Sequence, residues 1–378
     1  MDITQRTIVL ESQSLESAKE TVFPRILFVS CDHTDHSEAQ AVGNALARSL
    51  EQENWQVGYF QPPRVLPRLM SGSLLGEAIA RVIDKSAFVR DLARQISRYQ
   101  IVHLSAYSVR GISRLALPAL VLARFFGKKT VLHFGSAETE QFLERYGGWF
   151  HPLLKAADAI VVGSRYLEKV VGRAKLSTTR LTSPVDTETM QYREVITEQP
   201  RILVDTELEP SRGVGRAIRA FKLVKQKYPR TEMVVIGNGS LRAALRRSVS
   251  VNQLNGIEFV GDVSSEQRAK LYADCDVLLH PATADETPMS LVRAFAAGLP
   301  VVATDADGVL HMLRDRINAL VAPVGDHVVM ANRIIELVED PDLSLKLSRR
   351  GQHELRKYSW SRVRQDWINL YTHLLTSH

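Results

Sequence analysis

The sequence contains little cysteine and few aromatic residues. Only two of its 378 residues are cysteines, Cys31 and Cys275, and phenylalanine, tryptophan and tyrosine together make up 7%. Two cysteines so far apart in the sequence form neither a disulfide framework nor a four-ligand zinc site, which fits a protein of the reducing cytosol. With 45% hydrophobic and 24% charged residues, the composition is that of a globular protein with a sizeable core, and it excludes a disordered or low-complexity chain.

Long hydrophobic runs are also absent. The longest apolar stretch, residues 115–123, has nine residues, whereas a membrane-spanning helix needs about 20. The first 20 residues alternate polar and apolar side chains and include acids, which differs from the basic start and apolar stretch of a signal peptide. We therefore expect a cytoplasmic protein, and a peripheral position on the inner face of a membrane is the open alternative.

Charge of one sign is only slightly in excess. There are 48 lysines and arginines against 42 acids, a net charge of +6, and no block of basic and aromatic residues. We therefore expect no nucleic-acid partner. The excess is compatible with a phosphate-bearing ligand or an acidic membrane surface. Residues 64–98 are more basic than acidic and contain interspersed apolar residues, so they fit either peripheral membrane contact or an ordinary solvated helical face.

Short apolar, β-branched runs alternate with helix-length segments along almost the whole chain. Such runs, with little polar alternation, are typical of strands buried on both faces of a parallel sheet. They are residues 25–30, 56–60, 101–105, 129–133 and 159–163 in the first half, and 201–204, 232–237, 257–261, 276–280, 300–304 and 319–322 in the second. This alternation predicts an α/β protein with two doubly wound, Rossmann-like domains.

The same pattern predicts how the chain is divided. We expect a polar N-terminal arm over 1–21, an N-terminal domain over 22–195, a C-terminal domain over 196–358 and a C-terminal helix over 359–378. The join is placed in residues 190–199, which are polar and lack a strand pattern. The last segment has apolar residues three or four apart, so it needs a surface on which to bury them. We predict that it packs back on the N-terminal domain.

Residues 280–304 are the most informative stretch, and they read as strand, loop, helix, glycine turn and strand. Asp285 or Thr287 is placed to cap the helix, with Pro288 near its first turn. In an open α/β sheet, ligands bind beyond the carboxyl ends of the strands, and a helix N-terminus offers unpaired N–H groups. The stretch is therefore a candidate seat for a phosphate or a sugar hydroxyl. The alternative is an ordinary capped helix.

This stretch resembles the donor-site signature of family 4 retaining glycosyltransferases of the GT-B fold. The shared pattern runs from Pro281 through an acid, a second proline and Ala-x-Ala-x-Gly298 to the Pro-Val-Val-Ala-Thr ending at Thr304. Residues 156–164, 237–240, 259–264 and 271–281 are similar to further segments of that family. The resemblance implies two Rossmann-like domains that face an inter-domain cleft, an acceptor domain first and a nucleotide-sugar donor domain second.

What the resemblance implies is an enzyme that transfers a hexosyl group, with retention, from a nucleotide-diphosphate sugar to a hydroxyl acceptor. The acceptor is a glycan, a lipid-linked molecule or a small molecule. No cofactor and no metal is implied, because a helix N-terminus and basic side chains hold the leaving diphosphate. The implied donor-binding residues are Thr206, Arg212, Gly213, Gly237, Gly239, Glu286, Met289, Ser290, Leu291 and Arg293. Arg212 and the N–H groups of 289–291 hold the diphosphate, and Asp285 contacts the donor sugar as a catalytic residue.

The donor motif departs from the family at its charged positions. Where the family has two glutamates, this chain has Asp285 and Arg293, and arginine cannot accept hydrogen bonds from ribose hydroxyls. Arg293 either replaces a missing cation, contacts an extra acid on the substrate, or lies on a solvated helix face. Thr206 stands where the family has an arginine, whereas Arg212 keeps a cation able to hold a diphosphate oxygen.

The first domain carries two further groups of candidates. Asp32, His33 and His36 follow the first predicted strand, where the family often has two glycines. We expect a polar loop on the acceptor side there rather than a metal site, since no second cluster supplies further ligands. His133 ends another predicted strand, near the position where the family has a histidine that approaches the donor sugar. It is a catalytic candidate, and the alternative is a core histidine bonded to the backbone.

Two functions from different classes therefore remain. The first is an active retaining glycosyltransferase. The second is a catalytically inactive binding or scaffolding protein on the same fold, which the loss of the Gly-Arg pair and the charge reversal at Arg293 favour. Saturable binding of a nucleoside diphosphate separates the two.

Overall fold

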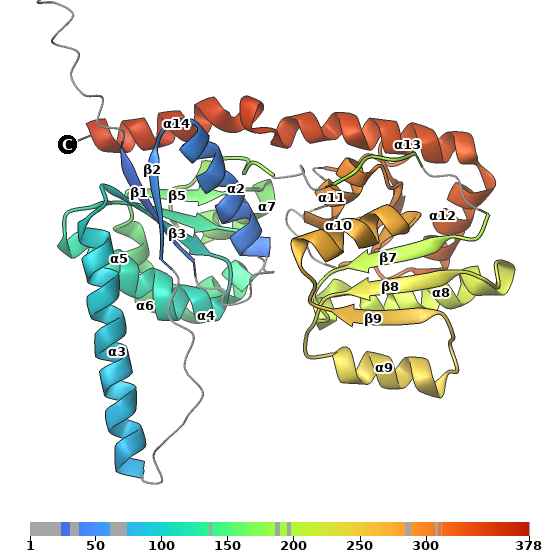
Figure 1. Cartoon of the computed structure of the whole chain (residues 1–378), viewed down its shortest axis with the longest axis horizontal. Helices are drawn as coiled ribbons and strands as arrows, with labels where there is room; N and C mark the ends of the chain where they lie inside the picture. Colours follow the sequence, from blue (N-terminus) through green and yellow to red (C-terminus); the bar gives the residue numbers. More distant parts are fainter. Residues whose placement is uncertain are drawn as a thin grey trace, which may run out of the picture.

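The chain folds into two α/β domains, each built around a six-stranded parallel sheet (Figure 1). The structure is a computed structural model, and it describes residues 24–30, 38–60, 74–135, 138–185, 190–194, 198–283, 289–306, 309–310 and 312–377. The predicted N-terminal arm, residues 1–21, lies outside the described residues.

The N-terminal sheet has the strand order β2-β1-β3-β4-β5-β6, with every neighbouring pair parallel. Its strands are β1 (Arg25–Val29), β2 (Gln56–Phe60), β3 (Ile101–Ala106), β4 (Lys129–Phe134), β5 (Ala159–Val162) and β6 (Thr179–Arg180). The helical segments are α2 (Glu38–Gln52), α3 (Leu74–Ser97), α4 (Val109–Gly111), η1 (Ile112–Ala116), α5 (Leu117–Phe125), α6 (Glu138–Lys155) and α7 (Arg165–Arg173).

The C-terminal sheet has the order β12-β11-β10-β7-β8-β9, again parallel throughout. Its strands are β7 (Arg201–Asp205), β8 (Glu232–Ile236), β9 (Ile257–Gly261), β10 (Val277–His280), β11 (Val301–Thr304) and β12 (Leu320–Ala322). The helical segments are η2 (Pro210–Arg212), α8 (Val214–Lys227), α9 (Arg242–Val251), α10 (Ser265–Asp274), α11 (Met289–Ala297), α12 (His327–Glu339), α13 (Pro341–Glu354), η3 (Leu355–Tyr358) and α14 (Trp360–Thr376).

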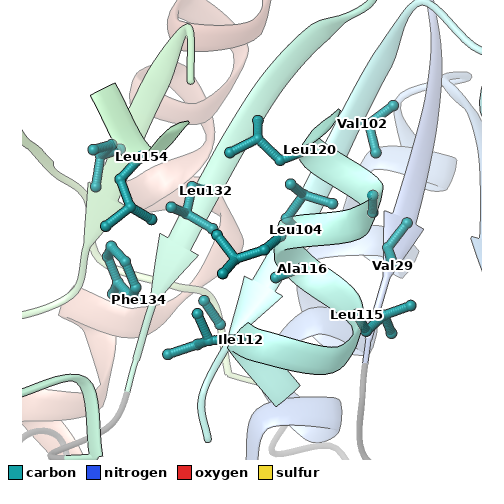
Figure 2. Packing of buried hydrophobic residues seen from close by; sticks show 14 of the residues in the cluster. Val29, Val102, Leu104, Ile112, Leu115, Ala116, Leu120, Leu132, Phe134 and Leu154 are labelled. Carbon is teal, nitrogen blue, oxygen red and sulfur yellow. The ribbon is translucent and has the colours of Figure 1, made fainter. Parts of the chain in front are cut away.

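Both faces of each sheet are covered by helices, which explains the nearly uniform apolar character of the strands. Side chains alternate between the faces with a period of two. On β3 and β4, Leu104 and Leu132 face the cluster that contains α5 (Figure 2), whereas Ile101 and Val131 face α2 and α14. In the second domain, Leu203 on β7 faces α11, and its neighbour Val204 faces α8 and α12.

A continuous run of helices, α13 then α14, connects the second domain back to the first (Figure 1). Val363, Trp367 and Tyr371 on α14 are buried against the N-terminal sheet. The indole N–H of Trp367 donates to the backbone oxygen of Thr182 at 2.8 Å, and Arg364 pairs with Glu53 at 2.6 Å. α14 is therefore an integral part of the first domain's core, although it follows the second domain in the sequence.

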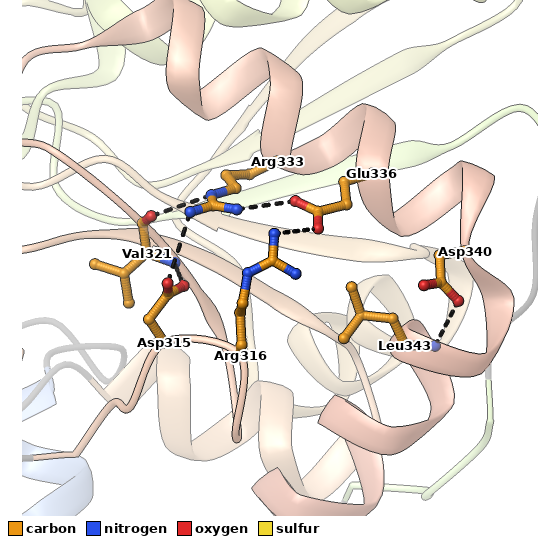
Figure 3. A network of polar contacts seen from close by, with 7 residues as sticks. All are labelled: Asp315, Arg316, Val321, Arg333, Glu336, Asp340 and Leu343. Carbon is orange, nitrogen blue, oxygen red and sulfur yellow. Dashed lines mark hydrogen bonds and ion pairs between the residues drawn. The ribbon is translucent and has the colours of Figure 1, made fainter.

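Ion pairs brace the far edge of the C-terminal domain, between α12 and the segment that leads to β12 (Figure 3). Arg333 on α12 pairs with Glu336 at 2.9 Å and donates to the backbone oxygen of Val321 at 3.3 Å. Glu336 also binds Arg316 at 2.6 Å. These groups are partly exposed, so each pair contributes modestly to stability.

The predicted α/β fold with two doubly wound, Rossmann-like domains is confirmed. Each predicted strand coincides with an observed strand to within about two residues. The predicted domain boundaries at 195 and 358 stay predictions.

Candidate functional site

Three loops at the carboxyl edge of the C-terminal sheet are linked to one another. Thr283, after β10, donates its backbone N–H and its hydroxyl to the backbone oxygen of Ser211 in η2, at 2.8 and 2.9 Å. Gly213, which follows η2, has φ +69°, and a Cβ built there would lie 1.9 Å from the backbone oxygen of Pro281. Only glycine fits this close approach. The turn that carries Arg212 is therefore fixed against the loop that leads to α11.

The loop after β8 joins the same group. Gly237 has φ +117°, and a Cβ there would lie 2.1 Å from the backbone oxygen of Thr206, while one at Gly239 would lie 2.6 Å from that of Leu208. Leu208 also donates its N–H to the backbone oxygen of Asn238 at 2.8 Å. The structure thus gives both glycines a packing role. Their predicted contact with the donor stays a prediction.

A group of buried charged residues at this edge surrounds Asp205, the last residue of β7. The side chain of Asp205 is 4% exposed. Its carboxylate pairs with Arg268 of α10, lies 3.5 Å from Arg293 of α11, and accepts a 2.8 Å hydrogen bond from the hydroxyl of Tyr272. We call these four residues the Asp205 cluster. Burial alone would raise the pKa of Asp205, but the two guanidinium groups outweigh it and hold the pKa below its usual value.

The placement of Arg293 excludes one of the three interpretations above. Its side chain is 11% exposed and lies against Asp205, so the interpretation as part of a solvated helix face is wrong. The physical reason is that all nine residues of α11 are buried, which leaves this helix without a solvated face. Arg293 joins α11 to the end of β7.

Neighbouring elements hold the first turn of α11 in place. The hydroxyl of Tyr272 lies 3.2 Å from the backbone oxygen of Ser290, and the hydroxyl of Ser290 lies 3.3 Å from Nδ1 of His280 on β10. Leu291 is fully buried in the core of this domain. The first N–H groups of an α-helix have no partner within the helix and carry partial positive charge. α11 therefore presents these groups from a fixed position.

Arg212 and Thr206 lie on the loop after β7. The Arg212 side chain is 16% exposed, and its guanidinium lies 3.4 Å from the carboxylate of Glu207. Glu209, in the same loop, accepts the N–H of Ser240 at 2.8 Å. Asp285 and Glu286 lie outside the described residues, as do Asp32, His33 and His36. The predicted roles of these residues stay predictions.

A small pocket lies between the two domains, beside the first turn of α11. Met289 and Tyr358 line it from one side, and His133, Tyr107 and Thr182 line it from the other. Two residues that the sequence proposes for the site, His133 and Met289, are thus brought together from elements more than 150 residues apart. The predicted contact of these residues with the donor stays a prediction.

His133 lies in a second polar group, of different character. Its Nδ1 is 3.2 Å from Nε2 of His103 on β3, and Nδ1 of His103 is 2.8 Å from the hydroxyl of Tyr371 on α14. We call these three residues the histidine cluster. Burial lowers the pKa of His133 to about 4, and burial followed by the charge of His133 lowers the pKa of His103 well below its usual value. Both imidazoles are neutral at physiological pH.

A larger cavity, of about 410 Å³, lies beside this pocket and shares Val185 and Tyr358 with it. α2, η3 and the start of α14 line it, with Arg48, Gln52 and Arg356 among the polar side chains. None of the described candidate residues lines it. We assign the site to the smaller pocket because Met289 of α11 and His133 line it together, and size alone is a weaker argument.

The described residues contain no group of three or more His, Cys, Asp or Glu side chains placed to hold a metal ion. In the same part of the chain, no helix is long and apolar enough to cross a membrane.

The sequence interpretation missed the partners that organise both groups. Arg268, Tyr272, His103 and Tyr371 were not singled out, because each reaches its partner through the fold. One signal was present, since the apolar run of β7 (residues 202–204 of RILVD) ends in an acid. A carboxylate that ends a buried strand requires cationic or hydrogen-bonding partners.

Comparison with known proteins identifies similar glycosyltransferases. The profile of the family described as Glycosyl transferases group 1 matches residues 186–354, which contain η2, the Asp205 cluster and α11. The chain is 24% identical over 220 residues to the amylovoran biosynthesis glycosyltransferase AmsK of Erwinia amylovora, covering 55% of this chain and 54% of that protein. It is 28% identical over 170 residues to the phosphatidyl-myo-inositol mannosyltransferase of Mycobacterium leprae, covering 45% of each. These alignments span about half the length of the relatives.

Solved structures match over more of the chain. The HepE protein of Anabaena, in complex with UDP and glucose, has a TM-score of 0.73 at 15% identity, with 92% of this chain and 99% of that one covered. The sucrose-phosphate synthase of Thermosynechococcus elongatus has a TM-score of 0.72 at 15% identity, with 94% and 100% covered. The fold is therefore GT-B, as the resemblance implied.

The resemblance to glycosyltransferases is confirmed, and it is most specific over residues 186–354, which match the group 1 family model.

Proposed function

We propose that this protein is a retaining glycosyltransferase that moves a sugar from a nucleotide-diphosphate sugar to a hydroxyl acceptor. One observation carries the proposal. Met289, in the first turn of α11, lines the inter-domain pocket from the domain that matches the group 1 glycosyltransferases. His133 lines the same pocket from the opposite domain. A donor bound there has its diphosphate on one domain and its sugar against the other.

The diphosphate is proposed to bind between Arg212 and the first turn of α11. Hydrogen bonds from Thr283 to Ser211 hold the turn that carries Arg212 against the start of the loop that leads to α11. As the glycosidic bond breaks, negative charge grows on the leaving diphosphate. Donors already aimed at that charge lower the barrier, because they need no reorganisation during the reaction. The proposal includes retention at the anomeric carbon and activity without a metal ion or other cofactor.

The relatives suggest which substrates to test first. The solved HepE structures hold UDP, UDP-glucose or UDP with glucose, so uridine nucleotides head the donor panel. The names of AmsK and of the mannosyltransferases make a glycan and a lipid-linked hydroxyl the first acceptors. Peripheral contact with the inner face of a membrane stays part of the proposal for the lipid-linked case.

The competing proposal is a catalytically inactive binding or scaffolding protein. The observation that favours it is the placement of Arg293 on Asp205, since that guanidinium serves the fold. Thr206 adds no cation in its place.

Calorimetric titration with UDP, GDP, ADP, CDP and dTDP tests the proposed donor site, and turnover then separates the two proposals. We expect saturable binding of at least one nucleotide, unchanged by a chelator. In Arg212→Ala, the affinity should fall about ten- to hundredfold, because a charge-assisted hydrogen bond contributes about 1.5–3 kcal/mol. Arg219→Ala, an exposed arginine on α8, is the matched control and should bind normally.

Turnover is then followed with the sugar nucleotide of whichever base binds. Release of the nucleoside diphosphate, with a product of unchanged anomeric configuration, supports the enzyme. Binding without turnover across the acceptor panel favours the scaffolding protein, and no binding of any nucleotide contradicts both the site and the enzyme.

A further inference from the structure

The histidine cluster extends from α14 to the inter-domain pocket as an unbranched row of hydrogen bonds. It begins at the hydroxyl of Tyr371, passes through both nitrogens of His103 and reaches Nδ1 of His133. Tyr371 and His103 are fully buried, and His133 is 2% exposed. Phe28 stacks on His103 with 4.7 Å between ring centroids, and Trp367 packs against both imidazoles. The row is therefore shielded from water except at its His133 end.

We propose that Tyr371 and His103 are positioning residues that fix the tautomer of His133, with the proton on Nε2, so that this nitrogen donates a hydrogen bond into the inter-domain pocket. The function assigned to that hydrogen bond, contact with an oxygen of the donor sugar, rests on the proposed function. The tautomer itself does not.

The direction of the row is set at Tyr371. Its hydroxyl has one proton, and its partner in the described part of the chain is Nδ1 of His103. A buried O–H group that donates to nothing carries a penalty of about 1–3 kcal/mol. Tyr371 therefore donates, and Nδ1 of His103 accepts.

The remaining protons follow from this first step. A neutral imidazole carries one N–H, so His103, which accepts at Nδ1, has its proton on Nε2. That N–H donates to Nδ1 of His133 at 3.2 Å. His133 then carries its own proton on Nε2, an atom that forms no hydrogen bond with any described residue. Since His133 lines the pocket, the N–H is available to a substrate oxygen or a water molecule.

This arrangement limits what His133 can do. Its accepting nitrogen is occupied by His103, and its free nitrogen already holds a proton. His133 is therefore a hydrogen-bond donor to the substrate, whereas a general base would present a bare nitrogen.

Nitrogen-15 NMR of the full chain with labelled histidine tests the inference directly. The chain has eleven histidines. The signals of His103 and His133 are identified by their loss in the His103→Gln and His133→Gln variants. The expected result for the unmodified chain at pH 7.5 is protonation of both rings at Nε2. Protonation of His133 at Nδ1 overturns the inference.

Tyr371→Phe tests the origin of the fixed tautomer. Without the donating hydroxyl, Nδ1 of His103 has no partner in either direction, so His133 should become a mixture of tautomers. The KM for the donor should rise severalfold, about fivefold for a hydrogen bond of ~1 kcal/mol. Tyr358→Phe changes a tyrosine that lines the pocket but lies outside the row, and it should leave the tautomer of His133 unchanged. A single Nε2–H tautomer in Tyr371→Phe contradicts the role of Tyr371.

The NMR readout needs no turnover. An Nε2–H tautomer in a protein that binds no nucleotide supports this inference and contradicts the proposed function. An Nδ1–H tautomer in an active enzyme contradicts this inference and leaves the proposed function standing.

Discussion

The two domains bury polar groups at comparable depth and satisfy them in opposite ways. In the C-terminal domain, Asp205 keeps its charge because two guanidinium groups and a tyrosine hydroxyl surround it. In the N-terminal domain, His103 and His133 give up their charge and form hydrogen bonds to each other and to Tyr371. The difference shows that the available partners, more than burial, decide the charge of a buried group.

The two clusters occupy equivalent places. Each lies on one face of a parallel sheet, and each fixes a helix from elsewhere in the chain, α11 in one case and α14 in the other. The charged cluster stands beside the proposed diphosphate position, and the neutral cluster reaches the proposed sugar position. An anionic leaving group and a neutral sugar call for this division of charge.

The largest expected effect comes from reversing a charge in the Asp205 cluster. Arg293→Glu places a second carboxylate in a buried site beside Asp205. The free energy of unfolding, measured in urea at pH 7.5, should fall by roughly 3–5 kcal/mol, because a buried charge loses its compensation. The family's glutamate at this position should thus destabilise this chain. In the control Arg219→Glu, on the exposed face of α8, the change should stay within about 0.5 kcal/mol. Equal effects in the two variants would show that Arg293 does not pair with Asp205.

The next effect is the pH dependence of the histidine cluster. Folded His133 binds its proton more weakly than unfolded His133, with a pKa near 4 against 6.5. Its contribution to stability is therefore complete above about pH 6.5 and declines as the pH falls toward 4, by roughly 3 kcal/mol. The pKa of Asp205 is lowered instead, so its contribution persists down to its ordinary pKa of 3.8.

Urea unfolding of the unmodified chain and of His133→Gln between pH 8 and pH 4 measures this difference. The two stability curves should run parallel above pH 6.5 and converge below it. Curves that stay parallel to pH 4 would mean that His133 is not buried in its neutral form.

The smallest expected effects come from removing one hydroxyl oxygen from each cluster. They compare the two clusters most directly. Tyr272→Phe removes a hydrogen bond to a charged carboxylate and should lower the free energy of unfolding by about 2 kcal/mol. Tyr371→Phe removes one to a neutral imidazole and should lower it by about 1 kcal/mol. Both are measured at pH 8, where the histidines are neutral. The reverse order would contradict the assigned charge states.

The strands and the fold could be predicted because their signal is local. Apolar runs such as RILFV and RILVD form buried parallel strands wherever helices cover both faces. The donor-loop positions rest on the resemblance, because Gly213, Met289 and their neighbours follow the family's spacing, and their roles stay predictions.

The partners could not be predicted, because the fold alone brings them together. Asp205 and Arg268 are 63 residues apart, and His103 and Tyr371 are 268 apart. The family's pattern showed that Arg293 stands where the family has a glutamate. Only the burial of α11 by tertiary packing excluded a position on a solvated helix face.

A crystal structure of the protein with the nucleoside diphosphate that it binds, followed by the matching sugar nucleotide, tests the central claim most directly. The account predicts diphosphate oxygens within hydrogen-bond distance of Arg212 and of the first turn of α11, and a sugar oxygen facing Nε2 of His133. A nucleotide seated in the larger cavity between α2 and η3, with the pocket beside α11 unchanged, would contradict it.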